Sequence, residues 1–151
     1  MRLYLSTPID RNQHDLEDGN SLALKVIETW ITDKPLALFS PVGAFSGAGP
    51  DSFKESEYNW IVEVNEKALH TCDAVIVWYR PGIESWGVPQ EVLMAKLWIK
   101  PVFVLAEHHR FDELPIYLKG RTKRDRVFTS IEPLIGKLLQ EERIGANHTP
   151  C

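Results

Sequence analysis

The chain has 151 residues, the size of one domain, and its 44% hydrophobic and 25% charged residues are typical of a folded globular protein. Its formal net charge of −4 argues against a nucleic-acid polymer as partner, because phosphate binding usually requires an excess of Lys and Arg. We expect no membrane partner either. No apolar run approaches the roughly 20 residues that span a bilayer, and the first residues do not resemble a signal peptide.

Cysteine usage is typical of a reducing compartment. Cys72 lies inside an apolar stretch and Cys151 is the last residue, so the two form neither a disulfide framework nor a metal-binding spacing. The adjacent His108 and His109 would point apart in an extended segment, which argues against a metal pair there. We therefore expect a cytoplasmic protein without a metal site.

Apolar runs alternate with segments of helical spacing along the whole chain. In chain order the sequence predicts a strand at 3–6, a helix at 21–32, a strand at 36–39, a helix at 52–71, a strand at 74–79, a helix at 88–99, a strand at 102–106, a short strand at 126–128 and a helix at 131–142. The strands are nearly continuous in apolar residues, as in a sheet covered on both faces. The alternation predicts a single α/β domain over residues 1–144, with a doubly wound parallel five-stranded sheet of flavodoxin-like or Rossmann-like layout. Residues 145–151 are expected to form a flexible tail.

In such sheets, ligands bind beyond the carboxyl ends of the strands, where the strand order switches. This rule points to three loops, 6–11, 40–50 and 80–90. The second contains GAFSGAG at 43–49, which is not a P-loop because no Lys followed by Ser or Thr comes after the last glycine. We interpret it as a mobile loop that covers the site.

Glu91 is the residue that carries chemistry in the third loop and the helix after it. A helix beginning near Val88 would place Glu91 in its first turn, where the positive end of the helix keeps a carboxylate ionised. An ionised, oriented carboxylate can serve as the nucleophile at a sugar carbon. Gly87 would let the backbone approach a ligand closely, and Ser85 would offer a hydroxyl at the mouth of the helix. The alternative is that Glu91 only complements the helix dipole, as many acidic residues do.

Three segments resemble the nucleoside 2-deoxyribosyltransferase-like superfamily, which includes the 2'-deoxynucleoside 5'-phosphate N-glycosidases. They are LYLSTP at 3–8, CDAVIV at 72–77, and SWGVPQE at 85–91 followed by Ala95 and by KPV at 100–102. The resemblance covers most of residues 1–106. It implies cleavage of the N-glycosidic bond of a (2'-deoxy)nucleoside or nucleoside 5'-monophosphate, with transfer of the sugar to another base or to water and without a cofactor.

The resemblance also assigns roles to particular residues. Glu91 would be the nucleophile, and Tyr4 would hydrogen-bond and orient its carboxylate. Asn65 takes the position of an acid that helps the base leave; its amide can hydrogen-bond a base edge but cannot donate a proton as an acid does. Four acidic residues could substitute for that acid: Asp51, Glu57, Glu63 and Glu66.

Substrate-binding residues are expected in three places. The sugar or a 5'-phosphate would contact the first loop and the turn before Glu91, at Ser6, Thr7, Arg11, Ser85 and Gly87. Trp86 would stack on the nucleobase, whereas Trp78 and Tyr79 are better interpreted as packing residues. The resemblance also implies that a neighbouring subunit contributes Thr129 or Ser130, so we expect a homo-oligomer.

Other interpretations remain open from the sequence alone. Because Asn65 replaces the family's acid, the chain could be a non-catalytic nucleotide-binding or sensing module of the same fold. A flavodoxin-like interaction domain without a small ligand is a third possibility. The basic run at 119–126 is interpreted as a solvated loop, with an anion contact as the alternative.

Overall fold

The computed structural model of the chain describes residues 1–7, 21–44, 55–82 and 87–146. Five parallel strands form one sheet in the order β2-β1-β3-β4-β5. They are β1 (Arg2–Ser6), β2 (Ala37–Phe39), β3 (Ala74–Trp78), β4 (Val102–Leu105) and β5 (Val127–Phe128). This is the flavodoxin-like order of a doubly wound sheet, so the predicted fold class is confirmed.

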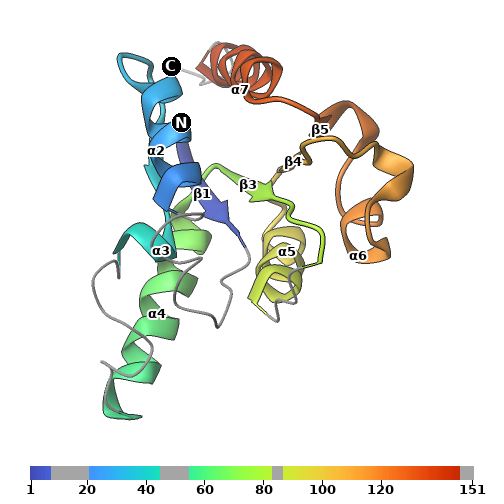
Figure 1. Ribbon diagram of the computed structural model, residues 1–151. Helices are drawn as coiled ribbons and strands as arrows, with labels where there is room; N and C mark the ends of the chain where they lie inside the picture. The colour runs from blue at the N-terminus through green and yellow to red at the C-terminus, as the bar shows by residue number, and fades with distance from the viewer. Residues whose placement is uncertain (8–20, 45–54, 83–86, 147–151) are drawn as a thin grey trace.

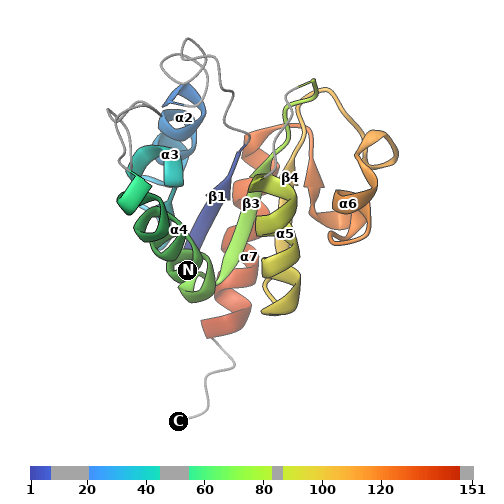
Figure 2. The same cartoon turned by 90° about the horizontal axis from the view of Figure 1, so that it is seen from below.

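Helices cover both faces of the sheet (Figure 1). One layer contains α4 (Glu55–Thr71), α5 (Gly87–Leu97) and the short α6 (Ile116–Lys119), and the opposite layer contains α2 (Ser21–Ile31) and α7 (Ile131–Ala146). In Figure 2, α4, α5 and α6 follow one another across their face, with α7 behind the sheet. No helix in the described ranges is long and apolar enough to cross a membrane.

The two layers create two separate apolar cores, because successive side chains of a strand point to opposite faces. On the face covered by α4, α5 and α6, the core includes Tyr4, Val75 and Val104, whereas Leu5 and Ile76 face α2 and α7. All of these side chains are fully buried. Ser6 follows Tyr4 by two residues and therefore shares the face of β1 that carries α5.

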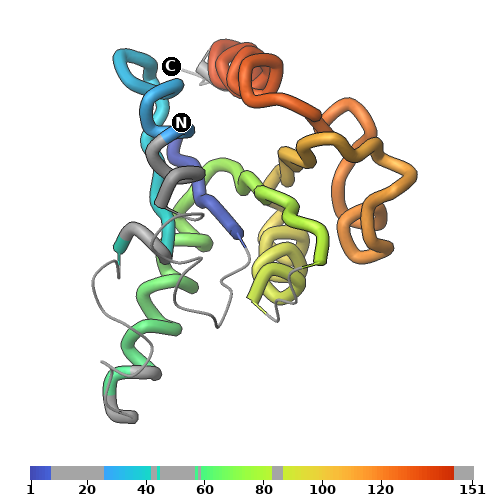
Figure 3. The backbone as a smooth tube through the Cα atoms, in the orientation of Figure 1, coloured from blue at the N-terminus to red at the C-terminus, as the bar shows by residue number. Residues whose placement is uncertain are grey.

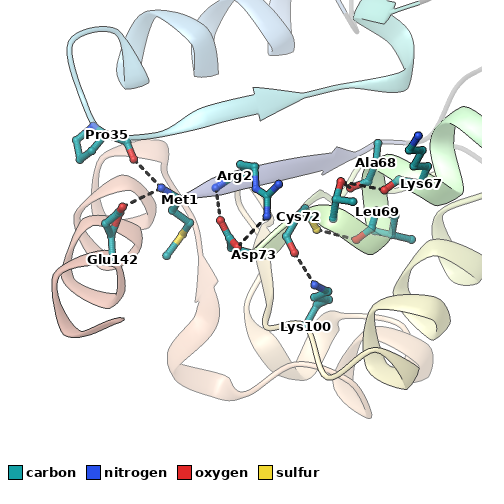
Figure 4. Close-up of polar contacts among 11 residues, drawn as sticks. Met1, Arg2, Pro35, Lys67, Ala68, Leu69, Cys72, Asp73, Lys100 and Glu142 are labelled. Carbon is teal, nitrogen blue, oxygen red and sulfur yellow. Dashed lines mark hydrogen bonds and ion pairs between the residues drawn. The ribbon is translucent and has the colours of Figure 1, made fainter. Parts of the chain in front are cut away.

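The amino edge of the sheet is fixed by polar contacts (Figure 4). The backbone N–H of Arg2 donates to Asp73 Oδ2 at 2.6 Å, and the Arg2 guanidinium lies 3.8 Å from Asp73 Oδ1. Lys100 Nζ donates to the carbonyl oxygen of Cys72 at 2.7 Å. Asp73 and Lys100, both part of the family-like motifs, thus have structural partners at the edge opposite to Glu91.

The structure departs from the predicted elements in a few places. Between β4 and β5 the chain makes an excursion that the sequence did not predict (Figure 3), with 3₁₀ helices η3 (Phe111–Glu113) and η4 (Arg124–Arg126) on either side of α6. A short helix, α3 (Pro41–Ala44), occupies the start of the second predicted loop. The last helix continues to Ala146, beyond the predicted domain end at residue 144, so residues 145 and 146 are helical; residues 147–151, the rest of the predicted tail, lie outside the described part.

Candidate active site

The strand order switches between β1 and β3. These two strands are neighbours, but β2 lies beyond β1 on one side and β4 lies beyond β3 on the other. The connections that leave their carboxyl ends therefore diverge, and a crevice is expected at this point. The helix that follows β3 is α5, which carries Glu91.

Both carboxylate oxygens of Glu91 accept hydrogen bonds from hydroxyl groups of β1. The Tyr4 hydroxyl donates to Oε1 at 2.7 Å, and the Ser6 hydroxyl donates to Oε2. Tyr4 and Ser6 can reach the same carboxylate because they lie on one face of the strand, two residues apart. The carboxylate is therefore held at two points at the switch in strand order.

Glu91 does not act as a helix cap. The helix begins at Gly87 and has no acidic residue in its first turn, so Glu91 opens the second turn rather than lying in the first as predicted. Its carboxylate accepts from side chains of a neighbouring strand instead of from N–H groups of its own helix. Among the ion pairs of the described residues, none involves Glu91. The alternative role in which it only complements the dipole has no support in this geometry.

Burial raises the pKa of Glu91 above the ordinary glutamate value, and the hydrogen bonds from Ser6 and Tyr4 oppose that rise. The sequence had suggested that the helix terminus keeps this carboxylate ionised, but the helix terminus is not among the causes of its pKa shift, and burial moves that pKa upward. Beyond the first turn the helix dipole has little effect, whereas removal from water penalises the charged form. The two hydroxyls are the groups that stabilise the anion.

Tyr4 is a neutral donor whose position is fixed by packing. Burial raises its pKa well above the ordinary tyrosine value, and the neighbouring Glu91 carboxylate raises it further, so the phenol keeps its proton. Its ring stacks on Phe39 of β2, with centroids 5.7 Å apart and planes at 30°. Sequence reasoning did not assign Phe39 to the site. The parallel register, which pairs Tyr4 with Phe39, would have indicated that Phe39 lies beside Tyr4.

Four buried side-chain atoms of the described residues lack a hydrogen-bond partner, and two of them, Oδ1 of Asn65 and the hydroxyl of Ser40, belong to residues toward the carboxyl edge of the sheet. Asn65 is two helical turns before Cys72, and α4 runs antiparallel to the strands, so Asn65 is displaced by about 10 Å toward the carboxyl edge of the sheet. Ser40 directly follows β2 at the same edge. Unpartnered buried polar atoms are rare in folded proteins, and Ser40 was not singled out from the sequence.

The remaining predicted site residues differ in their location. Thr7 is buried directly after β1, and Gly87 is the exposed first residue of α5. Arg11, Ser85 and Trp86 lie outside the described residues. Thr129 is exposed beyond β5, and the strands β3 and β4 separate it from β1, so within one subunit it is distant from Glu91.

Three of the four acidic residues suggested as substitutes for the acid that the resemblance implies lie in the part of the chain that the structure describes. Glu57, Glu63 and Glu66 are exposed on α4, and Asp51 lies outside the described residues. Trp78 and Tyr79 pack against the two cores. Within the described ranges there is no group of three His, Cys, Asp or Glu side chains that could hold a metal ion.

No protein-family model matches the sequence, and no curated protein matches it. Among solved structures, the chain is similar to a conserved protein from Enterococcus faecalis V583, with a TM-score of 0.59 and 18% sequence identity. The alignment covers 96% of this chain and 98% of that one. A likeness at this level of identity shows the shared α/β fold, and the activity has to be argued from the site.

Proposed function

We propose that the protein cleaves the N-glycosidic bond of a (2'-deoxy)nucleoside or nucleoside 5'-monophosphate, with Glu91 as the nucleophile. The observation that carries the proposal is the carboxylate whose two oxygens are held by Tyr4 and Ser6 at the switch in strand order. The motif resemblance in residues 1–106 supplies the substrate class.

The proposed reaction has two displacements. In the first, a carboxylate oxygen of Glu91 forms a bond to the anomeric carbon, and the base leaves with the electron pair of the broken C–N bond. In the second, water or another base attacks the same carbon, the Glu91 carboxylate is released, and the proton that the attacking group loses neutralises the base that left. Attack by water hydrolyses the substrate, whereas attack by another base transfers the sugar to that base.

The raised pKa of Glu91 suits this role. A buried carboxylate with a raised pKa is a better nucleophile than one paired with a cation. Its negative charge is less stabilised, so less stabilisation is lost when the carboxylate forms the bond to the sugar. The donor hydrogen bonds from Tyr4 and Ser6 fix the direction of attack, which reduces the entropy lost on reaching the transition state. No step of this mechanism requires a metal ion.

The test is a base-release assay. The purified protein is incubated with a panel of ribo- and deoxyribonucleosides and their 5'-monophosphates, and free base is separated by chromatography. We expect release from at least one member, with loss of release in Glu91→Gln. Addition of a second free base distinguishes transfer, which yields a new nucleoside, from hydrolysis, which yields free sugar.

A non-catalytic nucleotide-binding module is the second candidate, and Asn65 is the observation that favours it. An amide whose oxygen is buried and unpartnered can hydrogen-bond a ligand, but it cannot protonate a departing base. The same panel separates the two functions. If the protein only binds nucleotides, a nucleotide should raise its melting temperature and no free base should appear.

A further inference from the structure

Asn65 and Glu91 lie on the sheet-facing sides of two neighbouring helices. Asn65 is four residues before Leu69 on α4, and Glu91 is four residues before Ala95 on α5; both of these apolar residues are buried in the core that α4 and α5 cover. Residues four apart share a helix face. The two helices contact each other, and both contact β1 (Figures 1 and 2). The amide and the carboxylate therefore face the sheet from adjacent helices that cover β1.

The two residues also lie at a similar depth. Both helices run from the carboxyl edge to the amino edge of the sheet, because each connects the end of one parallel strand with the start of another. Asn65 precedes Thr71, the last residue of α4, by six positions, and Glu91 precedes Leu97, the last residue of α5, by six positions. Each is thus about 9 Å from the end of its helix. Because packed helices lie about 8–10 Å apart, a nucleoside that touches Glu91 can reach Asn65.

The direction of attack decides which part of the ligand Asn65 meets. In a displacement at carbon, the leaving group departs on the side opposite to the nucleophile. Glu91 belongs to α5, which follows β3, whereas α4 follows β2 on the other side of β1. A sugar held over β1 against Glu91 therefore directs its base toward α4 and Asn65.

The atom that Asn65 offers to the base is a hydrogen-bond acceptor. Its Oδ1 is buried and has no hydrogen-bond partner, and an amide oxygen pairs only with a donor. Adenine and cytosine carry an exocyclic amino group, which supplies such a donor. Hypoxanthine and uracil carry a carbonyl oxygen in the same place, and two facing acceptors leave each other unpaired.

We propose that Asn65 selects substrates whose base is adenine or cytosine, by accepting a hydrogen bond from the exocyclic amino group at Oδ1. This inference rests on the proposed function, which places the sugar against Glu91. It adds the class of base and assigns the preference for that class to one side chain.

Binding to the full-length Glu91→Gln protein tests the proposal without turnover. Dissociation constants are compared within two matched pairs, adenosine with inosine and cytidine with uridine, in their ribo- and 2'-deoxy forms and as 5'-monophosphates. We expect the amino member of at least one pair to bind about tenfold more tightly, the effect of one neutral hydrogen bond. The preference should disappear in Glu91→Gln/Asn65→Leu. Equal affinities within both pairs, no binding of any member, or a preference that persists in the double variant would overturn the proposal.

Stability measurements separate recognition from a structural role of the amide. Asn65→Leu replaces the amide with an apolar side chain of similar volume and removes a buried oxygen that makes no hydrogen bond, so its melting temperature should be no lower than that of the wild type. The matched control is Asn59→Leu, since Asn59 is exposed on the same helix, and this variant should keep the preference. A lower melting temperature of Asn65→Leu, with equal loss of affinity for both members of a pair, would indicate a structural role and overturn the proposal.

The ratio of base-release rates within each pair distinguishes this inference from the proposed function. The wild type should favour the amino member, Asn65→Leu should lose the preference, and Asn65→Asp should keep it because a carboxylate oxygen also accepts. Taking the ratio within each variant cancels changes in the overall rate. Base release without a preference would overturn the selection by Asn65 and leave the glycosidic cleavage in place. Preferential binding of the amino member without base release by the wild type would contradict the cleavage and support the selection.

Discussion

The Tyr4 hydroxyl lies 2.7 Å from Oε1 of Glu91, although 87 residues separate them in the chain. The first belongs to β1 and the second to α5, the helix that follows the neighbouring strand. Because the contact requires both the parallel pairing of β1 with β3 and the docking of α5, it forms only in the folded protein. The topology therefore brings the candidate nucleophile and the group that orients it into contact.

Removal of the Tyr4 hydroxyl should change the pH dependence of base release. Tyr4→Phe keeps the ring on Phe39 but removes one of the two donors that lower the pKa of Glu91. That pKa should rise further, so the midpoint of the pH–rate profile should move to higher pH. The measurement is the pH profile of base release under saturating substrate.

The control for that experiment is Phe39→Leu, which alters the stacking partner and leaves both hydroxyl donors in place. Its midpoint should stay with the wild type. Equal midpoints for wild type and Tyr4→Phe would contradict the assignment of Tyr4 as a donor to the ionised carboxylate.

Glu91→Gln should be more stable than the wild type above neutral pH. Burial raises the pKa of Glu91 in the folded state above its ordinary value of 4.5. Protonation of Glu91 therefore stabilises the folded state. This stabilisation is fully present below the pKa of the unfolded chain and is lost as the pH rises through the pKa of the folded protein. The amide carries no charge to bury, and it can still accept from Tyr4 and donate to Ser6. Melting temperatures of the two proteins should therefore separate at pH 8 and converge toward pH 4. A wild type that is the more stable at pH 8 would count against a costly buried anion.

Asp73→Ala should lower stability without lowering activity. The Asp73 carboxylate accepts from the backbone N–H of Arg2, and loss of a hydrogen bond to a charged group costs about 1.5–3 kcal/mol, with the lower end expected at this exposed position. Because the contact lies at the amino edge, away from Glu91, base release per folded molecule should be unchanged. Urea unfolding and the base-release assay measure the two effects separately. A strong loss of activity in folded Asp73→Ala would indicate that this motif residue takes part in the site.

The thiol of Cys72 should resist alkylation in the folded protein. Burial raises its pKa, an effect that Lys100 only partly opposes, and the side chain is 3% exposed. Both factors reduce the accessible thiolate that reacts with iodoacetamide. In a Cys151→Ser background at pH 8, labelling should occur only after denaturation. Rapid labelling under native conditions would show that α4 opens readily from the sheet.

The sequence was informative about the sheet because its strands are covered on both faces. Runs such as 74–79 and 102–106 are nearly continuous in apolar residues, and the structure has β3 and β4 within them. The segment between β4 and β5 lacked such a signal: α6 has only four residues, and its first residue, Ile116, faces solvent. Short helices without an apolar periodicity are held by tertiary contacts, which a local pattern does not encode.

The candidate site was predictable in part. The motif around Glu91 and the opening strand suggested its contact with Tyr4, and the period of two along β1 could have placed Ser6 on the same face. The direction of the pKa shift was not predictable, because it depends on how completely α5 and β1 exclude water from the carboxylate. Likewise, the unpartnered hydroxyl of Ser40 becomes visible only when its surroundings are known.

The most direct test of the account is whether the sugar becomes attached to Glu91. A substrate found in the base-release assay is resynthesised with fluorine at the 2' carbon, which slows both displacements by destabilising their oxocarbenium-like transition states, and the protein is then digested and analysed by mass spectrometry. The account predicts a fluorinated sugar on the peptide that contains Glu91, with none in Glu91→Gln. Release of base by Glu91→Gln at the wild-type rate, or attachment of the sugar to a different residue, would contradict it.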